Sequence, residues 1–226
     1  MVNTISPSTR AVGLWTAVLA TAFSITYDVA QIGEWFGLLG SSGGPESSST
    51  PLGIYVLLTP SLLLGSSFLA LIAAIHQLSA PDRKVWSLAA FGFAIIYAAL
   101  ISINYYVQLA WVGPRLADDR IQGMEPFLFV PFDSFLYAVD ILGYSFMSLA
   151  TLFAARVFTG GGQERIVRWF LVANGLVLPF LLFQMYVHAL IWIAAIWAVT
   201  FPGSTWALAV LFRRMPVHDQ TEVRAA

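Results

Sequence analysis

The sequence predicts an all-α, polytopic membrane protein built as a bundle of six transmembrane helices. Charged residues make up only 10% of its 226 residues, and the mean hydropathy is +0.77. A soluble domain carries about 25% charged residues. Apolar stretches of about 20 residues recur along the chain, and each is long enough to cross a hydrocarbon core of about 30 Å as a helix. These stretches do not alternate apolar with polar residues, as barrel strands would.

Six spans follow from these stretches and from the polar turns between them. Their expected bounds are roughly 12–36, 52–78, 85–111, 131–155, 166–187 and 190–212. The first span is too long for a signal peptide, so we expect it in the mature chain. Prolines inside apolar segments predict kinks at Pro60, Pro179 and Pro202.

The connections between the spans are short and rich in turn-forming residues. A Gly/Ser loop follows the first span, "SAPDRK" follows the second, and the polar segment 114–126 follows the third. The Gly-rich turn "RVFTGGGQER" separates the fourth span from the fifth, and a short connection near His188 separates the fifth from the sixth. Residues 213–226 form a polar tail. We expect residues 1–226 to form a single membrane domain.

Arginine and lysine predict the orientation, because cytoplasmic loops carry an excess of these residues. Nine of the 11 basic residues lie on the side of the two termini, and only Arg115 and Arg120 lie on the other. We therefore expect both termini in the cytoplasm. The chain is similar in size and style to small multi-span bacterial membrane proteins, so a bacterial cell membrane is its expected location and the lipid bilayer its expected partner.

Polar side chains gather at one depth, in the expected outer half of the bundle. Their spacing places several of them on shared helix faces, because residues three, four or seven apart lie on one side of a helix. Lipid does not tolerate such faces, so we expect them to point into the bundle or into a wet cavity. The candidate ligand-binding residues are Asp28, Asn104, Gln108, Asp133, Tyr137, Asp140, Gln184 and His188.

Three of the shared faces can be specified. Asp133, Tyr137, Asp140 and Tyr144 follow the i, i+4, i+7, i+11 pattern. Asn104 and Gln108 are four residues apart, and so are Gln184 and His188. Each set is therefore expected on one face of its own helix.

Structural roles compete with ligand binding at these positions. Asp133 follows Pro131 and is expected to cap the fourth helix. Glu34 is expected at headgroup level, beside Trp35. The tryptophans fall mostly toward span ends, where they are interpreted as interfacial anchors.

The deeper polar groups leave the choice open. Asn104 and Gln108 favour interhelical hydrogen bonds over ligand contacts, and His188 favours a hydrated loop. For Asp28 and Asp140, interhelical bonding and a functional role are equally favoured, because an acid inside a membrane is a functional hypothesis by default.

The sequence lacks the motifs that mark several classes of enzyme and cofactor-binding protein. The chain has no P-loop, dinucleotide fingerprint or HExxH motif. It has no cysteine, and its three histidines are far apart in sequence, so no metal site is expected. Lys84 lies in a turn, which excludes a retinal Schiff base. The Gly-x-Gly-Asp signature of intramembrane aspartyl proteases is absent at Asp140. We expect no catalytic residue, cofactor or nucleic-acid partner.

The leading hypothesis is a non-enzymatic membrane protein whose outward-facing, acidic pocket binds or passes a small cationic or amphipathic ligand. Carboxylates and tyrosines, but no base, lie at that depth, and tyrosine faces attract cations. One alternative is an intramembrane enzyme that uses Asp28 and Asp140 as an acid–base pair, with the two carboxyl groups within a hydrogen bond or one water of each other. Another is a structural or accessory subunit, whose acids would be paired and whose pocket would be closed.

Overall fold

The part of the chain that the structure describes contains six helical spans, each long and apolar enough to cross a membrane. The computed structural model describes residues 5–44, 49–129 and 132–217. The spans are Pro7–Trp35, Pro51–Leu78, Pro81–Ala117, Phe135–Ala155, Gly162–Phe183 and His188–Arg214. The predicted all-α class and the six spans are confirmed. Residue 131, where the fourth span was expected to begin, lies outside the described residues, as does most of the tail.

The spans contain nine α-helices in the described part of the chain. They are α1 (Pro7–Trp35), α2 (Pro51–Leu78), α3 (Lys84–Val107), α4 (Gly113–Ala117), α5 (Phe135–Ala155), α6 (Gly162–Gly175), α7 (Leu178–Phe183), α8 (Ile191–Ala194) and α9 (Trp197–Arg214). Three begin at a hydroxyl cap: the side chains of Ser6, Thr50 and Ser134 each accept a hydrogen bond from a backbone N–H three residues on. Proline in the first turn also favours the starts of α1 and α2.

Shorter helical turns lie within the spans or between them. Pro81–Arg83 (η1), Glu125–Phe127 (η3) and His188–Leu190 (η4) are 3₁₀ turns, and Gln108–Val112 (η2) is a π-helical turn at the end of α3. A π turn shifts the helical register, and such turns are frequent at functional sites.

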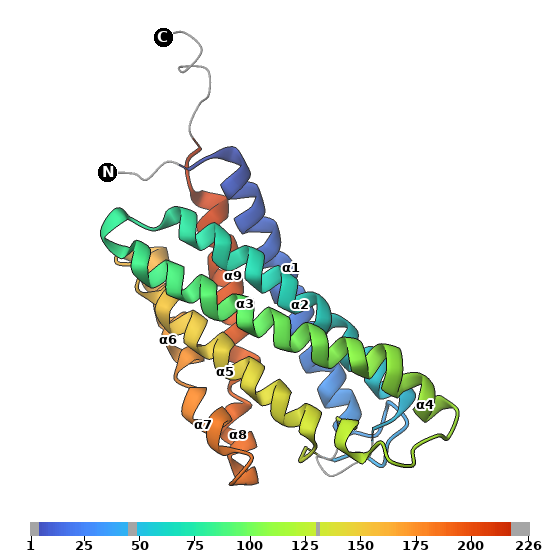
Figure 1. The fold of residues 1–226 in the computed structure, drawn as a ribbon. Helices are drawn as coiled ribbons and strands as arrows, with labels where there is room; N and C mark the ends of the chain where they lie inside the picture. Colours follow the sequence, from blue (N-terminus) through green and yellow to red (C-terminus); the bar gives the residue numbers. More distant parts are fainter. Residues whose placement is uncertain (1–4, 45–48, 130–131, 218–226) are drawn as a thin grey trace, which may run out of the picture.

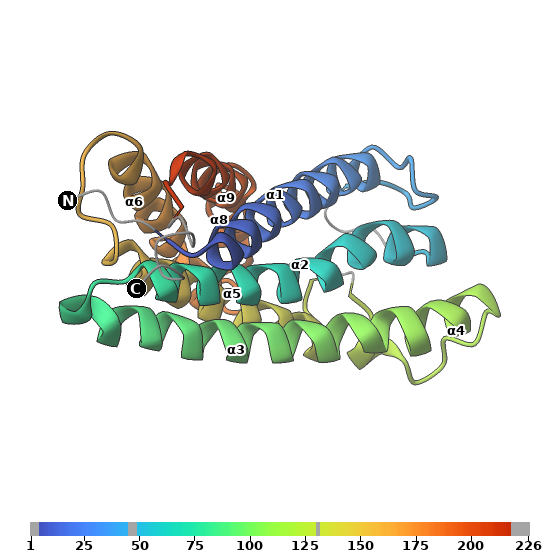
Figure 2. The same cartoon turned by 90° about the horizontal axis from the view of Figure 1, so that it is seen from above.

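The long helices pack as a closed ring in chain order. Each of α1, α2, α3, α5, α6 and α9 contacts the next, and α9 closes the ring on α1 (Figure 2). A hydrogen bond of 2.8 Å from the Thr21 hydroxyl to that of Thr205 joins α1 to α9. Aromatic rings fill the centre: Phe68 lies 5.5 Å from Tyr97 and 5.6 Å from Phe201 between ring centroids.

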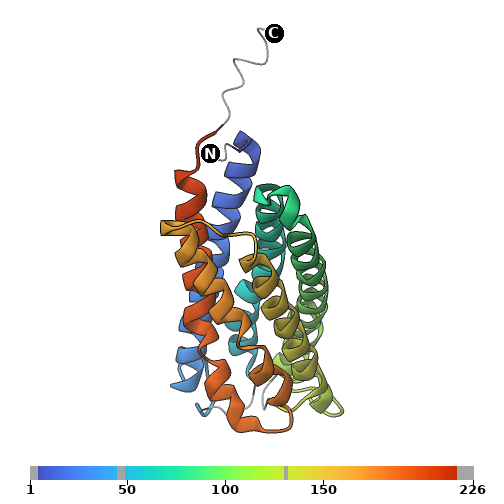
Figure 3. The same cartoon turned by 90° about the vertical axis from the view of Figure 1, so that its left-hand side faces the viewer.

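The start of α1 and the end of α9 lie at the same end of the bundle (Figures 1 and 3). The backbone N–H of Ile5 donates to the carbonyl of Pro216 at 3.1 Å. We call the opposite end, where α1 ends at Trp35 and α5 begins at Phe135, the distal end. An even number of spans returns the chain to the side on which it started, so six spans place both termini at the same end of the bundle.

The fifth and sixth spans are interrupted toward the distal end. In the fifth, α6 ends at Gly175 and α7 begins at Leu178, with Pro179 in its first turn, so the disturbance expected at this proline is a helix break. In the sixth, α8 and α9 are separated at 195–196, while Pro202 lies inside α9. Figure 1 shows α7 and α8 apart from the distal halves of α1 and α3, while α7 stays packed on α5.

Candidate functional site

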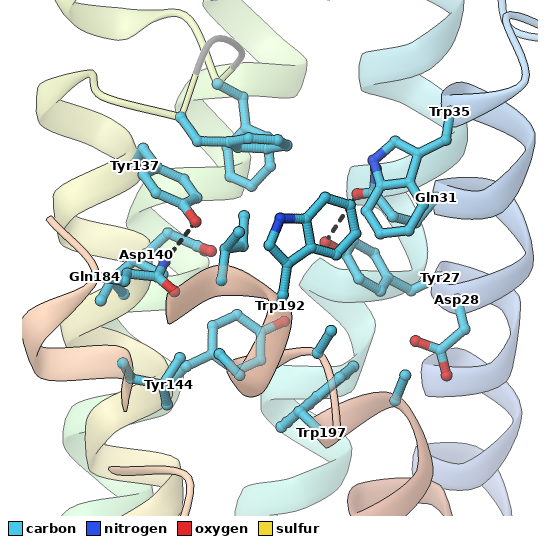
Figure 4. Close-up of a pocket in the computed structure, with 18 of the residues that line it drawn as sticks. Tyr27, Asp28, Gln31, Trp35, Tyr137, Asp140, Tyr144, Gln184, Trp192 and Trp197 are labelled. Carbon is cyan, nitrogen blue, oxygen red and sulfur yellow. Dashed lines mark hydrogen bonds between the residues drawn. The ribbon is translucent and has the colours of Figure 1, made fainter. Parts of the chain in front are cut away.

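A cavity of about 320 Å³ lies toward the distal end, where α8 is separated from α1. Its walls come from α1, α5, α7, α8, the first turn of α9 and the segment before α5 (Figure 4). Aromatic side chains supply much of the lining: Tyr27, Trp35, Phe129, Phe132, Tyr137, Tyr144, Trp192 and Trp197. The polar groups beside the tyrosine hydroxyls are Asp28, Gln31, Asp140 and Gln184. The cavity is thus more aromatic than the polar pocket that the sequence predicts.

One wall is a single face of α1. Tyr27, Asp28, Gln31 and Trp35 all line the cavity, because residues four and eight positions apart repeat on one side of a helix. The Tyr27 hydroxyl donates a hydrogen bond of 3.2 Å to Oε1 of Gln31. Asp28 is half-buried, and no described residue donates a hydrogen bond to it or forms an ion pair with it. Its carboxyl group is available to the cavity.

The opposite wall is a face of α5, carrying Tyr137, Asp140 and Tyr144 as their spacing predicts. Asp140 is 4% exposed, and its Oδ1 accepts a hydrogen bond of 3.1 Å from Nδ2 of Asn104 on α3. The hydroxyl of Tyr105, the next residue of α3, lies 3.2 Å from the Tyr144 hydroxyl. The hydrogen bond from Asn104 therefore ties the Asp140 side chain to α3.

Gln184 extends the polar wall from α7. Its Nε2 donates a hydrogen bond to the Tyr137 hydroxyl. Its Oε1 is buried and has no hydrogen-bond partner in the described part of the chain. A buried acceptor without a partner is unfavourable, so a donor group in the cavity would stabilise this side chain.

The two cavity carboxyl groups differ in their surroundings. Figure 4 places Asp28 and Asp140 on opposite walls, with Trp192 and Trp197 between α1 and α5. No hydrogen bond joins the two acids. Asp140 is tied into the fold, whereas Asp28 has no partner among the described residues.

Four of the eight predicted site residues do not line the cavity. Asn104 lies behind Asp140 as its hydrogen-bond donor. Gln108 lies in the π turn, where its Nε2 donates to the carbonyl of Phe127. Asp133 is exposed and precedes α5, and Ser134 rather than Asp133 caps the helix, so the capping prediction is wrong. His188 is exposed and stacks on Phe132 at 6.4 Å between ring centroids.

The expected pairing of Gln184 with His188 on one face is wrong for a physical reason. It assumed one continuous helix, but α7 ends at Phe183 and His188 begins the separate turn η4. Gln184 is consequently buried, and His188 faces outward. Asn104 and Gln108, by contrast, keep their expected shared face: both are fully buried, and the backbone N–H of Gln108 still donates to the carbonyl of Asn104 before the π turn begins.

Sequence reasoning missed the tryptophans of the site. Trp35, Trp192 and Trp197 line the cavity, although the tryptophans were mostly interpreted as interfacial anchors. Trp35 and Trp192 meet with ring centroids 5.5 Å apart, and Tyr27 meets Trp197 edge to face at 6.0 Å. The spacing of Trp35 from Tyr27, Asp28 and Gln31 on α1 is the signal that could have placed it here.

Glu34 lies one residue before the end of α1 and is buried in the protein. It is 3% exposed, and its Oε2 has no hydrogen-bond partner among the described residues. The carboxyl group lies against the first turn of α2: a Cβ added to Gly53 would be 3.0 Å from Oε2. The positive end of the α2 dipole favours a carboxylate at this position.

Among residues 5–44, 49–129 and 132–217, no three histidine or acidic side chains are grouped so that they could hold a metal ion. Comparison of the chain with protein-family models, with curated proteins and with solved structures gives no match. The chemistry of the cavity is therefore interpreted from its own residues.

Proposed function

We propose that this protein is a non-enzymatic membrane protein whose cavity binds a small amphipathic organic cation. One observation carries the proposal: Asp28 presents a carboxyl group with no described partner to an aromatic cavity inside a membrane span. An uncompensated charge in such surroundings is costly, and a bound cation would supply the missing partner.

The rest of the lining fits the same class of ligand. Aromatic ring faces attract organic ammonium groups, and the apolar side chains suit a hydrocarbon body. No arginine or lysine is present among the described lining residues to compete for the acids. The cavity volume of about 320 Å³ lies at the lower end of the range for small-molecule sites.

The two alternative functions receive less support. An acid–base pair requires carboxyl groups within a hydrogen bond or one water, whereas Asp28 and Asp140 lie on opposite walls (Figure 4). A purely structural subunit requires paired acids and a closed pocket, whereas Asp28 has no partner among the described residues and the cavity is large enough to hold a small ligand.

Binding is also favoured over transport. A transporter needs a polar route from the cavity toward the termini, and Asn174 on α6 is the amide on that route. Its Nδ2 donates to the Thr151 hydroxyl at 3.2 Å, and its Oδ1 accepts from the Thr200 hydroxyl at 3.2 Å. Asn174 is fully buried, so these groups join α5, α6 and α9 instead of facing a pathway.

The charge bias completes the proposal. We place both termini in the cytoplasm, and hence the distal end and the cavity in the outer half of the membrane. On the chain's size and composition alone, we assign it to a bacterial cell membrane.

A matched pair of probes tests the proposed ligand class. Benzyltrimethylammonium and neopentylbenzene have nearly the same shape, but a carbon atom replaces the charged nitrogen in the second. With the protein in lipid nanodiscs, we expect the ammonium compound to quench tryptophan fluorescence saturably and to raise Tm, with an affinity at least about tenfold above that of the neutral compound. Equal affinities, or no binding of the cation, would refute the proposal.

A further inference from the structure

We infer that the ligand is a single-chain amphiphile, with its ammonium head inside the cavity and its alkyl chain passing between α1 and α8 into the bilayer. This inference rests on the proposed function and adds to it the class of the ligand and its route of entry. It is carried by the position of the cavity mouth, by the distribution of polar atoms and by one aromatic contact.

The mouth of the cavity lies on the side of the bundle. Among the lining residues, Ile32 on α1 is 51% exposed, Trp192 on α8 is 57% exposed, and Ala195 is also exposed. In the described chain, α1 packs along α2 and α9 but not along α8. Ile32 and Ala195 both belong to membrane spans. The opening between them therefore faces lipid.

A tryptophan pair lies on the distal side of this mouth. Trp35 and Trp192 bridge α1 and α8, with ring centroids 5.5 Å apart. Ile32 precedes Trp35 by three residues, and Ala195 follows Trp192 by three, so each lies about 4.5 Å farther from the distal end. The pair separates the opening from the distal surface, which makes the side opening the more direct route for a molecule dissolved in the membrane.

Polarity changes from the mouth to the far wall. The mouth residues Ile32 and Ala195 are apolar. Figure 4 shows Tyr137, Asp140 and Gln184 on the wall across the cavity from α1. Asp28 lies one helical turn from Ile32 on the same wall. A ligand that enters from lipid therefore meets an apolar rim first and carboxyl groups deeper inside. A cavity of about 320 Å³ suits a head group, so a long chain would remain outside in the bilayer.

Photolabelling of the wild-type protein in nanodiscs tests this geometry. The probe is a dodecyltrimethylammonium analogue with a diazirine near the end of its chain, and the adducts are mapped by mass spectrometry. Excess benzyltrimethylammonium identifies the specific adducts, because only these are suppressed. We expect suppressible adducts on the exposed edges of the mouth, at Val29 and Ile32 on α1 and at Ala195 and Ile196 after α8. Suppressible adducts confined to the distal loop around Leu38, or none at all, would overturn the inference.

A matched pair of variants tests the route independently. Ala195→Trp narrows the mouth, whereas Ala189→Trp makes the same change at an exposed position of η4 that does not line the cavity. We expect Ala195→Trp to weaken binding of dodecyltrimethylammonium at least about tenfold and to change binding of benzyltrimethylammonium much less. Ala189→Trp should leave both affinities unchanged. An equal effect of Ala195→Trp on both probes, or no effect on either, would overturn the inference.

The two failures are distinguishable. If benzyltrimethylammonium does not bind the wild-type protein, the proposed function fails, and this inference fails with it. If it binds but the chain of the longer probe is not found between α1 and α8, the proposed function stands and only the bilayer route is refuted.

Discussion

Asn104 on α3 donates a hydrogen bond of 3.1 Å to Asp140 on α5, and both side chains are buried. This contact gives one cavity acid a partner from a neighbouring helix. The other acid, Asp28, has no such partner among the described residues. One carboxyl group is therefore part of the helix packing, and the other is left for a ligand.

Removing the donor should destabilise the fold. We expect Asn104→Leu to lower the free energy of unfolding by about 1–3 kcal/mol, because it leaves the buried Asp140 carboxyl group with one donor fewer. The measurement is thermal unfolding of the purified protein in detergent. The double variant Asn104→Leu/Asp140→Leu should recover a large part of the loss, because it removes both polar partners. An unchanged Tm for Asn104→Leu would show that the contact is not stabilising.

The packing at the break of the fifth span gives a second prediction. A Cβ added to Gly175 would collide with the Leu152 side chain and would lie 2.9 Å from the Ser148 carbonyl. We expect Gly175→Ala to cost about 1–3 kcal/mol in the free energy of unfolding. Gly33→Ala is the matched control, because a Cβ there meets nothing within 4 Å.

The control variant Gly33→Ala is expected to change stability in the opposite direction or not at all. Gly33 lies within α1, where alanine is favoured over glycine by up to about 1 kcal/mol. We therefore expect Gly33→Ala to be neutral or stabilising in the same unfolding measurement. Equal Tm values for the two alanine variants would contradict the close approach of α5 and α6 at Gly175.

The spans were predictable from sequence because each depends on local hydropathy alone. The face of Tyr137, Asp140 and Tyr144 was predictable too, since α5 is continuous between these residues. Gln184 and His188 were misplaced because the chain leaves the helix after Phe183. The helix also breaks between α8 and α9, but residues 195–196 include no proline or glycine, so the sequence gives no signal of this break. That break helps to form the cavity, so the tryptophan lining could not be derived from local patterns.

The orientation can be tested directly because the chain has no cysteine. Gln122→Cys places a thiol in an exposed segment at the distal end of the bundle. Asp82→Cys places one in an exposed turn at the opposite end, where the two termini lie. We expect a membrane-impermeant maleimide to label Gln122→Cys in intact cells and to label Asp82→Cys only after permeabilisation. The reverse pattern would invert the topology and place the cavity in the inner half of the membrane.

The most direct measurement is binding of benzyltrimethylammonium to Asp28→Asn, beside the wild type and Asp133→Asn. Both variants remove one carboxylate near the same end, but Asp133 is exposed and does not line the cavity. We expect Asp28→Asn to lose affinity at least about tenfold, because it removes the unpaired charge, and to keep or raise Tm, because a site kept for function is often strained. Asp133→Asn should bind as the wild type does. Wild-type affinity in Asp28→Asn would contradict the assignment of the cavity as a cation-binding site.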